Sequence, residues 1–367
     1  MSRNPENPSP FEIAGHSIAP GKAGRIRIPV SHQVTGLDAS LALQILHGRR
    51  AGPTVFVSAA IHGDEIVGTA ITQRLIKTLS AERLAGTLIL APAVNIYGFM
   101  QHSRYLPDRR DLNRNFPGNS SGSLASQLAR CFLENVIERC ALGIDLHSAA
   151  INRYNLPQIR IAAGDERLVE LAMAFGAPII IESPLRGGSM RAHAHERGTP
   201  MLLLESGEAL RFDRLSIDIG TGGILRVLAH LGMVDAHDGM DEPRIPMRSN
   251  NSRWVRAPRG GVTHRLRKSG DRVTTGERLA TVSGLFGEDP EELVSPFDGI
   301  VIGHATLPVV YQGDALFHIA EIDDPEHIGE EADTVDQAIT ASTPRGPARP
   351  MLDEDEIIDE VPGEDRP

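Results

Sequence analysis

Four side chains with the chemistry of a hydrolytic metal site lie beside three predicted strands of this chain: His62, Glu65, His147 and Glu205. His62 and Glu65 are three residues apart across a turn, so an imidazole and a carboxylate could face one point. A helix-capping carboxylate beside a loop histidine would give the same spacing. Two neutral imidazoles and one carboxylate are the ligand set of a catalytic zinc ion, which keeps a further position for water. Glu205 could then act as the base that takes a proton from that water.

The elements around these residues predict where they meet. Residues 54–60 are apolar and β-branched, which predicts a buried strand, and Asp64 is a good N-cap for an amphipathic helix after the turn. Residues 86–93 form the next apolar strand, and the order strand, helix, strand is typical of a parallel βαβ unit. His147 and Glu205 each end a further apolar strand. Because open α/β sheets bind ligands at the carboxyl ends of their strands, we expect the four side chains to meet there.

The whole pattern predicts an α/β fold in which a mixed, mostly parallel sheet is flanked by helices, with a small C-terminal all-β barrel-sandwich domain. We expect an irregular lead-in over residues 1–22, a catalytic domain over 23–240, the β domain over 250–322 and an acidic, disordered tail over 325–367. From Glu321 onward there are 16 acidic residues against 3 arginines, so the tail accounts for the formal net charge of −11. The rest of the chain has no strong excess of either charge.

Four motifs in chain order then resemble a known family: His62-Gly63-Asp64-Glu65, Asp111-Leu112-Asn113-Arg114-Asn115-Phe116, Asp145-Leu146-His147 and Glu205-Ser206-Gly207. Together they look like the succinylglutamate desuccinylase and aspartoacylase group of the zinc carboxypeptidase-like metallohydrolases. The resemblance spans about residues 50–210. It implies one Zn²⁺ per chain, bound by His62, Glu65 and His147, with Glu205 as the general base.

The resemblance also assigns substrate-binding roles in an arginine-rich loop. Asn113 and Arg114 would clamp a substrate carboxylate, for which the planar fork of a guanidinium is suited. Arg104 would face the oxyanion that develops on the acyl carbonyl, although Arg109 and Arg110 lie close enough in the sequence to take that role.

Three other residues near the expected site have two interpretations each. Asp145 could orient a ligand histidine, or it could cap an element or pair with a nearby arginine. Arg186 and Arg191 flank a Gly-Gly pair and could recognise a second acidic group. For these two we favour solvated surface charges.

The small β domain has two similar halves, each with a Gly-Asp pair before an apolar strand. It resembles a lipoyl or biotinyl carrier domain and equally the C-terminal β domain of the metallohydrolase family. A carrier displays a lysine on the hairpin between its halves, but here that hairpin reads SGLFGEDPEELVSP. We therefore expect a domain that packs on the catalytic one and narrows the entrance to the zinc, which favours small substrates. Tyr311 could reach the site, but a core or surface tyrosine is the simpler interpretation.

These observations predict a zinc-dependent amidohydrolase that removes an acetyl- or succinyl-type N-acyl group from a small carboxylate-bearing amino acid or related metabolite, with water activated at the metal. A carboxypeptidase-like peptidase on the same scaffold is one alternative. A non-catalytic metal-binding interaction protein is another, but it would need neither Glu205 nor the arginine-rich loop. An iron oxygenase with two histidines and one carboxylate would leave the arginine clamp unexplained.

The expected partner is a small N-acylated amino acid, with no nucleic acid and no membrane, and a homo-oligomer is compatible with the sequence. No apolar run approaches the length of a membrane span, and the first residues lack the layout of a secretory signal. The two cysteines, Cys131 and Cys140, give no disulfide framework. We therefore expect a cytoplasmic protein.

Overall fold

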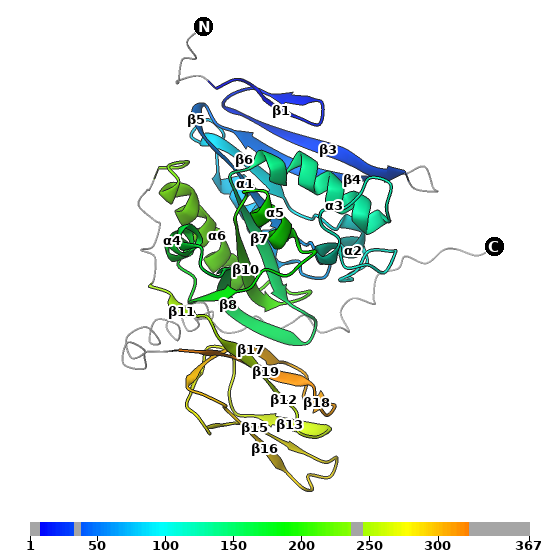
Figure 1. The fold of residues 1–367 in the computed structure, drawn as a ribbon, viewed down its shortest axis with the longest axis vertical. Coiled ribbons are helices and arrows are strands. Elements are labelled where there is room, and N and C mark those ends of the chain that lie inside the picture. The colour runs from blue at the N-terminus through cyan, green and yellow to red at the C-terminus, as the bar shows by residue number, and fades with distance from the viewer. Residues whose placement is uncertain (1–7, 33–37, 236–244, 323–367) are drawn as a thin grey trace, which may run out of the picture.

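The computed structural model describes residues 8–32, 38–235 and 245–322, in which a large sheet with helices on both faces continues into a smaller β domain (Figure 1). The strands of the larger part are β3 (Lys22–His32), β4 (Asp38–His47), β5 (Arg50–Ala59), β6 (Ala85–Ala91), β7 (Leu142–Ala149), β8 (Arg153–Ala162), β9 (Ile179–Ser183) and β10 (Met201–Glu208). Those that follow are β11 (Met247–Ser249), β12 (Ser252–Arg256), β13 (Gly261–Arg265), β14 (Arg272–Val273), β15 (Arg278–Ser283), β16 (Glu291–Val294), β17 (Gly299–Ala305), β18 (Val309–Val310) and β19 (Ala315–Glu321).

The centre of the large sheet is parallel. Strands β6, β5, β7 and β10 lie in that order, each parallel to its neighbour. At one side β4 and then β3 are added antiparallel, and at the other side β8 runs antiparallel to β10. The predicted mixed, mostly parallel sheet is confirmed. This arrangement brings the carboxyl ends of β5, β7 and β10 to one edge.

Helices cover both faces of the sheet (Figure 1). They are α1 (Val67–Thr78), α2 (Ile96–Met100), α3 (Leu124–Asn135), α4 (Glu166–Phe175), α5 (Met190–Glu196) and α6 (Arg214–His230), with 3₁₀ turns η1 (Leu112–Arg114) and η2 (Ile137–Arg139). Ile71 of α1 and Phe175 of α4 pack with Val55 on one face, whereas Phe132 of α3 packs with Phe56 on the other. Consecutive residues of β5 thus enter opposite cores, as the alternation of side chains along a strand requires.

The loop between β5 and α1 differs from the prediction. Asp64 is not the helix N-cap, because the helix begins after Ile66, which makes no side-chain capping hydrogen bond. The Glu65 N–H instead donates to the His62 carbonyl at 3.1 Å, and the Asp64 carbonyl accepts from the Leu210 N–H at 2.9 Å. These bonds hold a buried, non-helical turn, so the helix starts later than a capping Asp64 would imply.

Gly63 allows this turn to lie against the backbone of α2. A Cβ atom at Gly63 would lie 2.0 Å from the carbonyl carbon of Gly98 and 2.2 Å from the nitrogen of Phe99. The Asn95 N–H also donates to the Ala60 carbonyl at 3.0 Å. This close approach restrains the loop that carries His62.

The N-terminal segment also differs from the prediction of an irregular lead-in. Strands β1 (Phe11–Ile13) and β2 (His16–Ile18) form an antiparallel hairpin, and Ile13 and Ile18 are buried in the core beneath it. The turn uses Ala14 and Gly15, both at positive φ. A strand of three residues is too short to give a clear alternation in the sequence.

The smaller β domain is joined to the large sheet by strand pairing. β17 lies antiparallel to β8, with Gly303 opposite Asn155, and β19 and β12 extend the sheet from there. A second sheet of β16, β15, β13 and β18 packs on this extension over a core that includes Leu279 and Phe317. The predicted C-terminal β domain is confirmed. Tyr311 is 80% exposed and therefore a surface residue.

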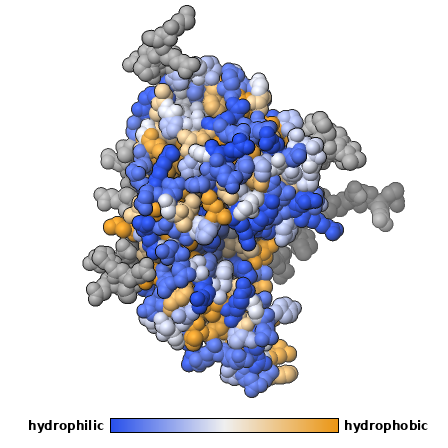
Figure 2. Space-filling model, viewed as in Figure 1, coloured by the Kyte–Doolittle hydropathy of each residue, from blue (hydrophilic) through white to orange (hydrophobic). Residues whose placement is uncertain are grey.

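The surface is mainly hydrophilic with scattered hydrophobic patches on the face shown in Figure 2. No helix of the described residues combines the length and apolar character needed to cross a membrane. The predicted boundary near residue 240 and the acidic tail from residue 325 lie outside the described residues, so they stay predictions.

Candidate active site

Three parallel strands bring the predicted chemical side chains to one edge of the sheet. β5 leads into the loop with His62 and Glu65, β7 carries His147 and β10 carries Glu205. His147 and Glu205 are register partners on neighbouring strands. One cavity of about 310 Å³ is lined by all seven site residues predicted from the sequence: His62, Glu65, Arg104, Asn113, Arg114, His147 and Glu205.

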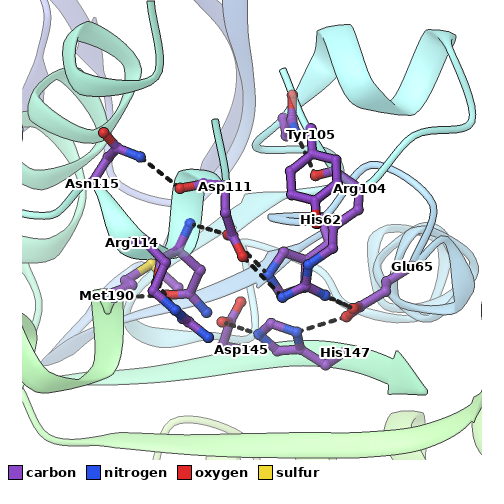
Figure 3. Close-up of polar contacts among 12 residues, drawn as sticks. His62, Glu65, Arg104, Tyr105, Asp111, Arg114, Asn115, Asp145, His147 and Met190 are labelled. Atoms are coloured by element: carbon purple, nitrogen blue, oxygen red, sulfur yellow. Dashed lines mark hydrogen bonds and ion pairs between the residues drawn. The ribbon is translucent and has the colours of Figure 1, made fainter. Parts of the chain in front are cut away.

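The Glu65 carboxylate lies between the two imidazoles (Figure 3). His62 Nδ1 is 2.7 Å from Glu65 Oε1, and His147 Nδ1 is 2.7 Å from Glu65 Oε2. One candidate ligand atom from each of the three residues lies within 4.8 Å of the other two, and all three residues are buried. Two nitrogens and one carboxylate thus converge on an enclosed point, which is a group that could hold a metal ion.

A further carboxylate lies behind each imidazole (Figure 3). His147 Nε2 is 2.7 Å from Asp145 Oδ2, and the Ser58 hydroxyl donates to Asp145 Oδ1 at 2.7 Å. His62 Nε2 is 3.3 Å from Asp111 Oδ1. A carboxylate in this position keeps the proton on Nε2 and leaves the Nδ1 lone pair for a metal. Asp145 therefore contacts one site histidine, and Asp111, a residue without a predicted role, contacts the other.

The charges around the imidazoles favour a cation. Burial alone would lower the pKa of His147, but the charges of Asp145 and Glu65 outweigh it and raise this pKa well above 6.5. Burial likewise opposes the charge of Glu65 at His62, and the pKa of His62 is raised. Burial would raise the pKa of Glu65, yet the two imidazoles hold it well below its usual range. Without a metal ion, these shifts favour the protonated, positively charged form of the two imidazoles. A bound metal ion would supply that positive charge in place of the protons.

We expect Asp145→Asn to weaken metal binding about 10- to 100-fold, because the amide cannot hold the Nε2 proton of His147 as a carboxylate does. Competition with a chromophoric chelator would measure the affinity. Asp218→Asn, which changes an exposed carboxylate on α6, is the matched control and should bind metal as the native chain does. An Asp145→Asn variant with native affinity would show that this carboxylate does not support the site.

Arg104 reaches the site from the loop after α2. Its Nη1 is 3.1 Å from Glu65 Oε1, and its Nη2 is 3.0 Å from Asp111 Oδ2. Arg109 and Arg110 are not among the residues that line the cavity. Of the three arginines that the sequence left open for the oxyanion role, Arg104 is the one at the cavity.

Asn113 and Arg114 of η1 form another part of the cavity wall. Asn113 Oδ1 accepts a hydrogen bond from the Met190 N–H at 2.8 Å, which fixes the orientation of the amide and leaves Nδ2 to donate to a ligand. Arg114 Nη1 donates to the Asn113 carbonyl at 2.5 Å. Arg114 forms no ion pair with any carboxylate of the described residues, so its charge is free to meet that of a substrate.

Glu205 is held by a residue that the sequence did not single out. The Asn155 Nδ2 donates to Glu205 Oε2 at 3.0 Å. Burial raises the pKa of Glu205, and the positive charges of Arg160 and His147 oppose this effect without cancelling it. A carboxylate with a raised pKa is a better proton acceptor near neutral pH. No sequence pattern around Asn155 predicts that it contacts Glu205.

The smaller β domain supplies one side of the cavity. Trp254 of β12 and His318 of β19 are among the lining residues. Their rings stack with centroids 4.5 Å apart and planes inclined by 12°, and the Arg153 guanidinium lies 5.1 Å from the Trp254 ring centre. The domain therefore packs on the catalytic part and bounds the site.

The structure corrects the interpretation of Arg191 as a solvated surface charge. It lines the cavity, and its Nη1 is buried without a hydrogen-bond partner, whereas Arg186 is exposed at the same cavity. Arg160, a residue without a predicted role, also lines the cavity. Its signal was a single arginine inside an apolar strand, in the run QIRIAA.

The fold and this site define an α/β protein with a candidate metallohydrolase centre. The family model of the succinylglutamate desuccinylase/aspartoacylase catalytic domain matches residues 51–231. The chain is 29% identical over 337 residues to N-alpha-acetyl-L-2,4-diaminobutyric acid deacetylase of Halomonas elongata, in an alignment that covers 88% of this chain and 98% of that protein.

Two solved structures are similar as well. The succinylglutamate desuccinylase/aspartoacylase from Rhodobacter sphaeroides aligns with a TM-score of 0.72 and 29% identity, covering 83% of this chain and 95% of that one. The product-bound ectoine utilization protein EutE (DoeB) from Ruegeria pomeroyi aligns with a TM-score of 0.74 and 26% identity, covering 87% and 100%. The chain belongs to the succinylglutamate desuccinylase/aspartoacylase family, and it is a deacylase.

Proposed function

We propose that this chain is a zinc-dependent amidohydrolase that removes an acetyl- or succinyl-type N-acyl group from a small carboxylate-bearing amino acid or related metabolite. The observation that carries the proposal is the presence of the His62, Glu65 and His147 group in the same cavity as Glu205 and Arg114. Two imidazoles and one carboxylate, each imidazole backed by a further carboxylate, suit zinc. A relative named as a deacetylase of an N-acetylated amino acid supports the type of bond.

A zinc ion held by His62, Glu65 and His147 would polarise the acyl carbonyl and lower the pKa of a water molecule. Glu205 accepts the proton of the attacking water and returns it to the nitrogen that leaves when the amide bond breaks. Arg104 donates hydrogen bonds to the acyl oxygen as negative charge develops there.

Asn113 and Arg114 bind the substrate carboxylate and so fix the direction from which the acyl group enters. A guanidinium binds a carboxylate through two parallel hydrogen bonds, which restrains orientation as well as position. Such positioning lowers the entropic cost of reaching the reactive geometry. The products are a carboxylic acid and a free amine.

The alternative is a carboxypeptidase-like peptidase, and the size of the site argues against it. A cavity of about 310 Å³ with Trp254 and His318 on one side is at the lower end of the range for small-molecule sites. Acid release from N-acetyl and N-succinyl amino acids should be compared with amino-acid release from N-blocked dipeptides. We expect the higher kcat/KM for the N-acyl amino acids; a higher value for the dipeptides would favour the peptidase.

The pH dependence of hydrolysis should report on Glu205 and its neighbour Arg160. Glu205 must be ionised to accept a proton, so activity falls as the pH drops through its raised pKa. The charge of Arg160 lowers this pKa, and Arg160→Gln should therefore move the acid limb of the kcat/KM profile to higher pH. Arg167→Gln, on the exposed side of α4, is the control. An acid limb at the same pH in Arg160→Gln and the native chain would contradict the role of Glu205 as base.

We further propose a cytoplasmic location, which the cysteines support. Cys131 and Cys140 are both free thiols, as expected in a reducing compartment. Burial raises the pKa of the Cys131 thiol to about 11, so this thiol stays protonated and unreactive near neutral pH. Neither cysteine therefore suggests a disulfide role.

A further inference from the structure

Asn155 lies where the large sheet meets the smaller β domain. Its strand, β8, has β10 on one side and β17 of the β domain on the other (Figure 1). Asn155 is opposite Gly207 in β10 and opposite Gly303 in β17. It is buried, and its Nδ2 donates to Glu205 Oε2 at 3.0 Å. The Glu205 carboxylate is thus contacted from the strand on which the β domain is built.

Gly303 leaves the space in which the Asn155 amide lies. A Cβ atom at Gly303 would be 2.8 Å from Asn155 Oδ1, which is too close for two atoms that are not bonded. The next nearest atoms, His318 Cβ and the Tyr154 carbonyl oxygen, would be at an ordinary contact distance of 3.5 Å. The φ of Gly303 is not positive, so its backbone does not need the freedom of a glycine. The position requires the absence of a side chain, because the Asn155 amide fills that space.

Side-chain hydrogen bonds hold the β domain against β8 on either side of Asn155. Gln158 Nε2 donates to the Ile302 carbonyl of β17 at 3.1 Å. The Ser269 hydroxyl, also in the β domain, donates to the Tyr154 carbonyl at 3.2 Å. The β domain therefore cannot move away from Asn155 without breaking bonds on both sides of it.

The backbone around Glu205 gives this side chain little support. Regular pairing of β10 ends at Glu205 on both sides of the strand, because the register shifts after this residue relative to β7 and relative to β8. Such irregularities disrupt the ladder locally and change the direction of side chains. The direction of the Glu205 carboxylate therefore depends on contacts of the side chain itself, and Asn155 supplies one of them.

This contact decides which oxygen of the carboxylate can act as the base. Asn155 occupies Oε2, so Oε1 is left to accept the proton of the attacking water. Proton transfer needs the base within hydrogen-bond reach of that water. A misplacement of about 1 Å can cost about 100-fold in rate, so the orientation of the carboxylate matters as much as its presence.

We propose that Asn155 is a positioning residue for Glu205, and that the β domain keeps Asn155 in place through the bare Cα of Gly303. The β domain then contributes to the chemical step as well as bounding the cavity. This inference rests on the proposed role of Glu205 as base and extends it to the contact between the two parts of the molecule.

Asn155→Ala in the zinc-loaded full chain tests the first half of the proposal. With the N-acetyl or N-succinyl amino acid that the native chain hydrolyses best, kcat should fall about 10- to 100-fold while KM and bound zinc stay native, because only the orientation of the base is lost. Asn251→Ala is the matched control, since the Asn251 amide also donates to a carboxylate, that of exposed Glu321. A native kcat in Asn155→Ala, or a change in KM alone, would overturn the proposal.

Gly303→Ala tests the second half from the other domain. The atom that the new methyl group would meet is the end of a side chain, so the Asn155 amide can turn away while both strands stay in place. We expect kcat to fall about 10-fold, with native KM, zinc content and Tm. Gly260→Ala is the control in the same domain, because a Cβ atom there would meet no atom closer than 3.5 Å. A native kcat in Gly303→Ala would contradict the role of Gly303.

The double variant shows whether the two residues act through one contact. Once Asn155→Ala has removed the amide, Gly303→Ala has nothing left to displace, so the double variant should have the kcat of Asn155→Ala alone. Losses that multiply in the double variant would show that Gly303 acts independently of Asn155, and would overturn the proposed link.

Glu205→Gln, measured beside these variants, separates this inference from the proposed function. If Glu205→Gln loses hydrolysis while Asn155→Ala and Gly303→Ala keep it, the inference fails and the proposed function stands. If Glu205→Gln keeps the native kcat, or the native chain hydrolyses no N-acyl amino acid, the proposed function fails and the inference fails with it.

Discussion

Glu205→Gln is expected to lower kcat by about 10²- to 10⁴-fold and to leave the metal content unchanged. The amide has the shape of the carboxylate but cannot accept the proton of the attacking water. Glu205 is not part of the His62, Glu65 and His147 group, so its loss removes no candidate metal ligand. Steady-state hydrolysis of an N-acyl amino acid and elemental analysis of the same sample would measure both quantities.

Glu208→Gln is the matched control for this variant. Glu208 lies on the same strand, β10, but outside the cavity, where its carboxylate accepts a hydrogen bond from the Asn152 N–H at 3.0 Å. We expect Glu208→Gln to keep the native kcat. If Glu205→Gln and Glu208→Gln reduced kcat to the same small extent, Glu205 would not be the base.

His147→Ala is expected to abolish both metal retention and hydrolysis. The substitution removes one of three converging donors and leaves the buried carboxylates of Asp145 and Glu65 without the imidazole that separates them. Like charges that face each other in a buried site repel, so the remaining residues would not hold their geometry. Metal content after gel filtration and the zinc-induced rise in Tm would report the loss, because a ligand that binds only the folded state stabilises it.

His195→Ala is the control for the histidine substitution. His195 lies on α5, with its side chain 39% exposed, and it does not line the cavity. This variant should retain metal, activity and the zinc-induced rise in Tm. Full metal content in His147→Ala would show that the three residues do not form the metal site.

Much of the site could be predicted because its main residues follow local rules. His62 and Glu65 are close in the sequence, and His147 and Glu205 end apolar strands, so the strand-edge rule was enough to group them. The structure places them around one cavity, while their chemical roles stay predictions. The predicted start of α1 at Asp64 was wrong. The hydrogen bond from the Leu210 N–H to the Asp64 carbonyl, in the turn before the helix, is a long-range contact that the sequence does not show.

The rest of the cavity depends on pairings between distant strands. Asn155 and Arg160 reach the site because their strand, β8, pairs antiparallel with β10. Trp254 reaches the site because β17 of the β domain pairs with β8, and because β12, the strand of Trp254, pairs with β19 of the same domain. Alternation along a single strand gives the face of each residue but not its partner strand. Arg191 was assigned to the surface for the same reason, since its burial is produced by packing that no local pattern encodes.

Zinc reconstitution tests the central claim most directly. The native chain would be stripped with a chelator and titrated with Zn²⁺ while acid release from an N-acetyl or N-succinyl amino acid is followed. We predict that hydrolysis disappears on chelation and returns in proportion to the zinc bound, with a limit of one ion per chain. Full hydrolysis by the metal-free chain, or one bound zinc ion per chain with no release of acid from any N-acyl amino acid, would contradict the claim that this chain is a zinc-dependent deacylase of amino-acid substrates.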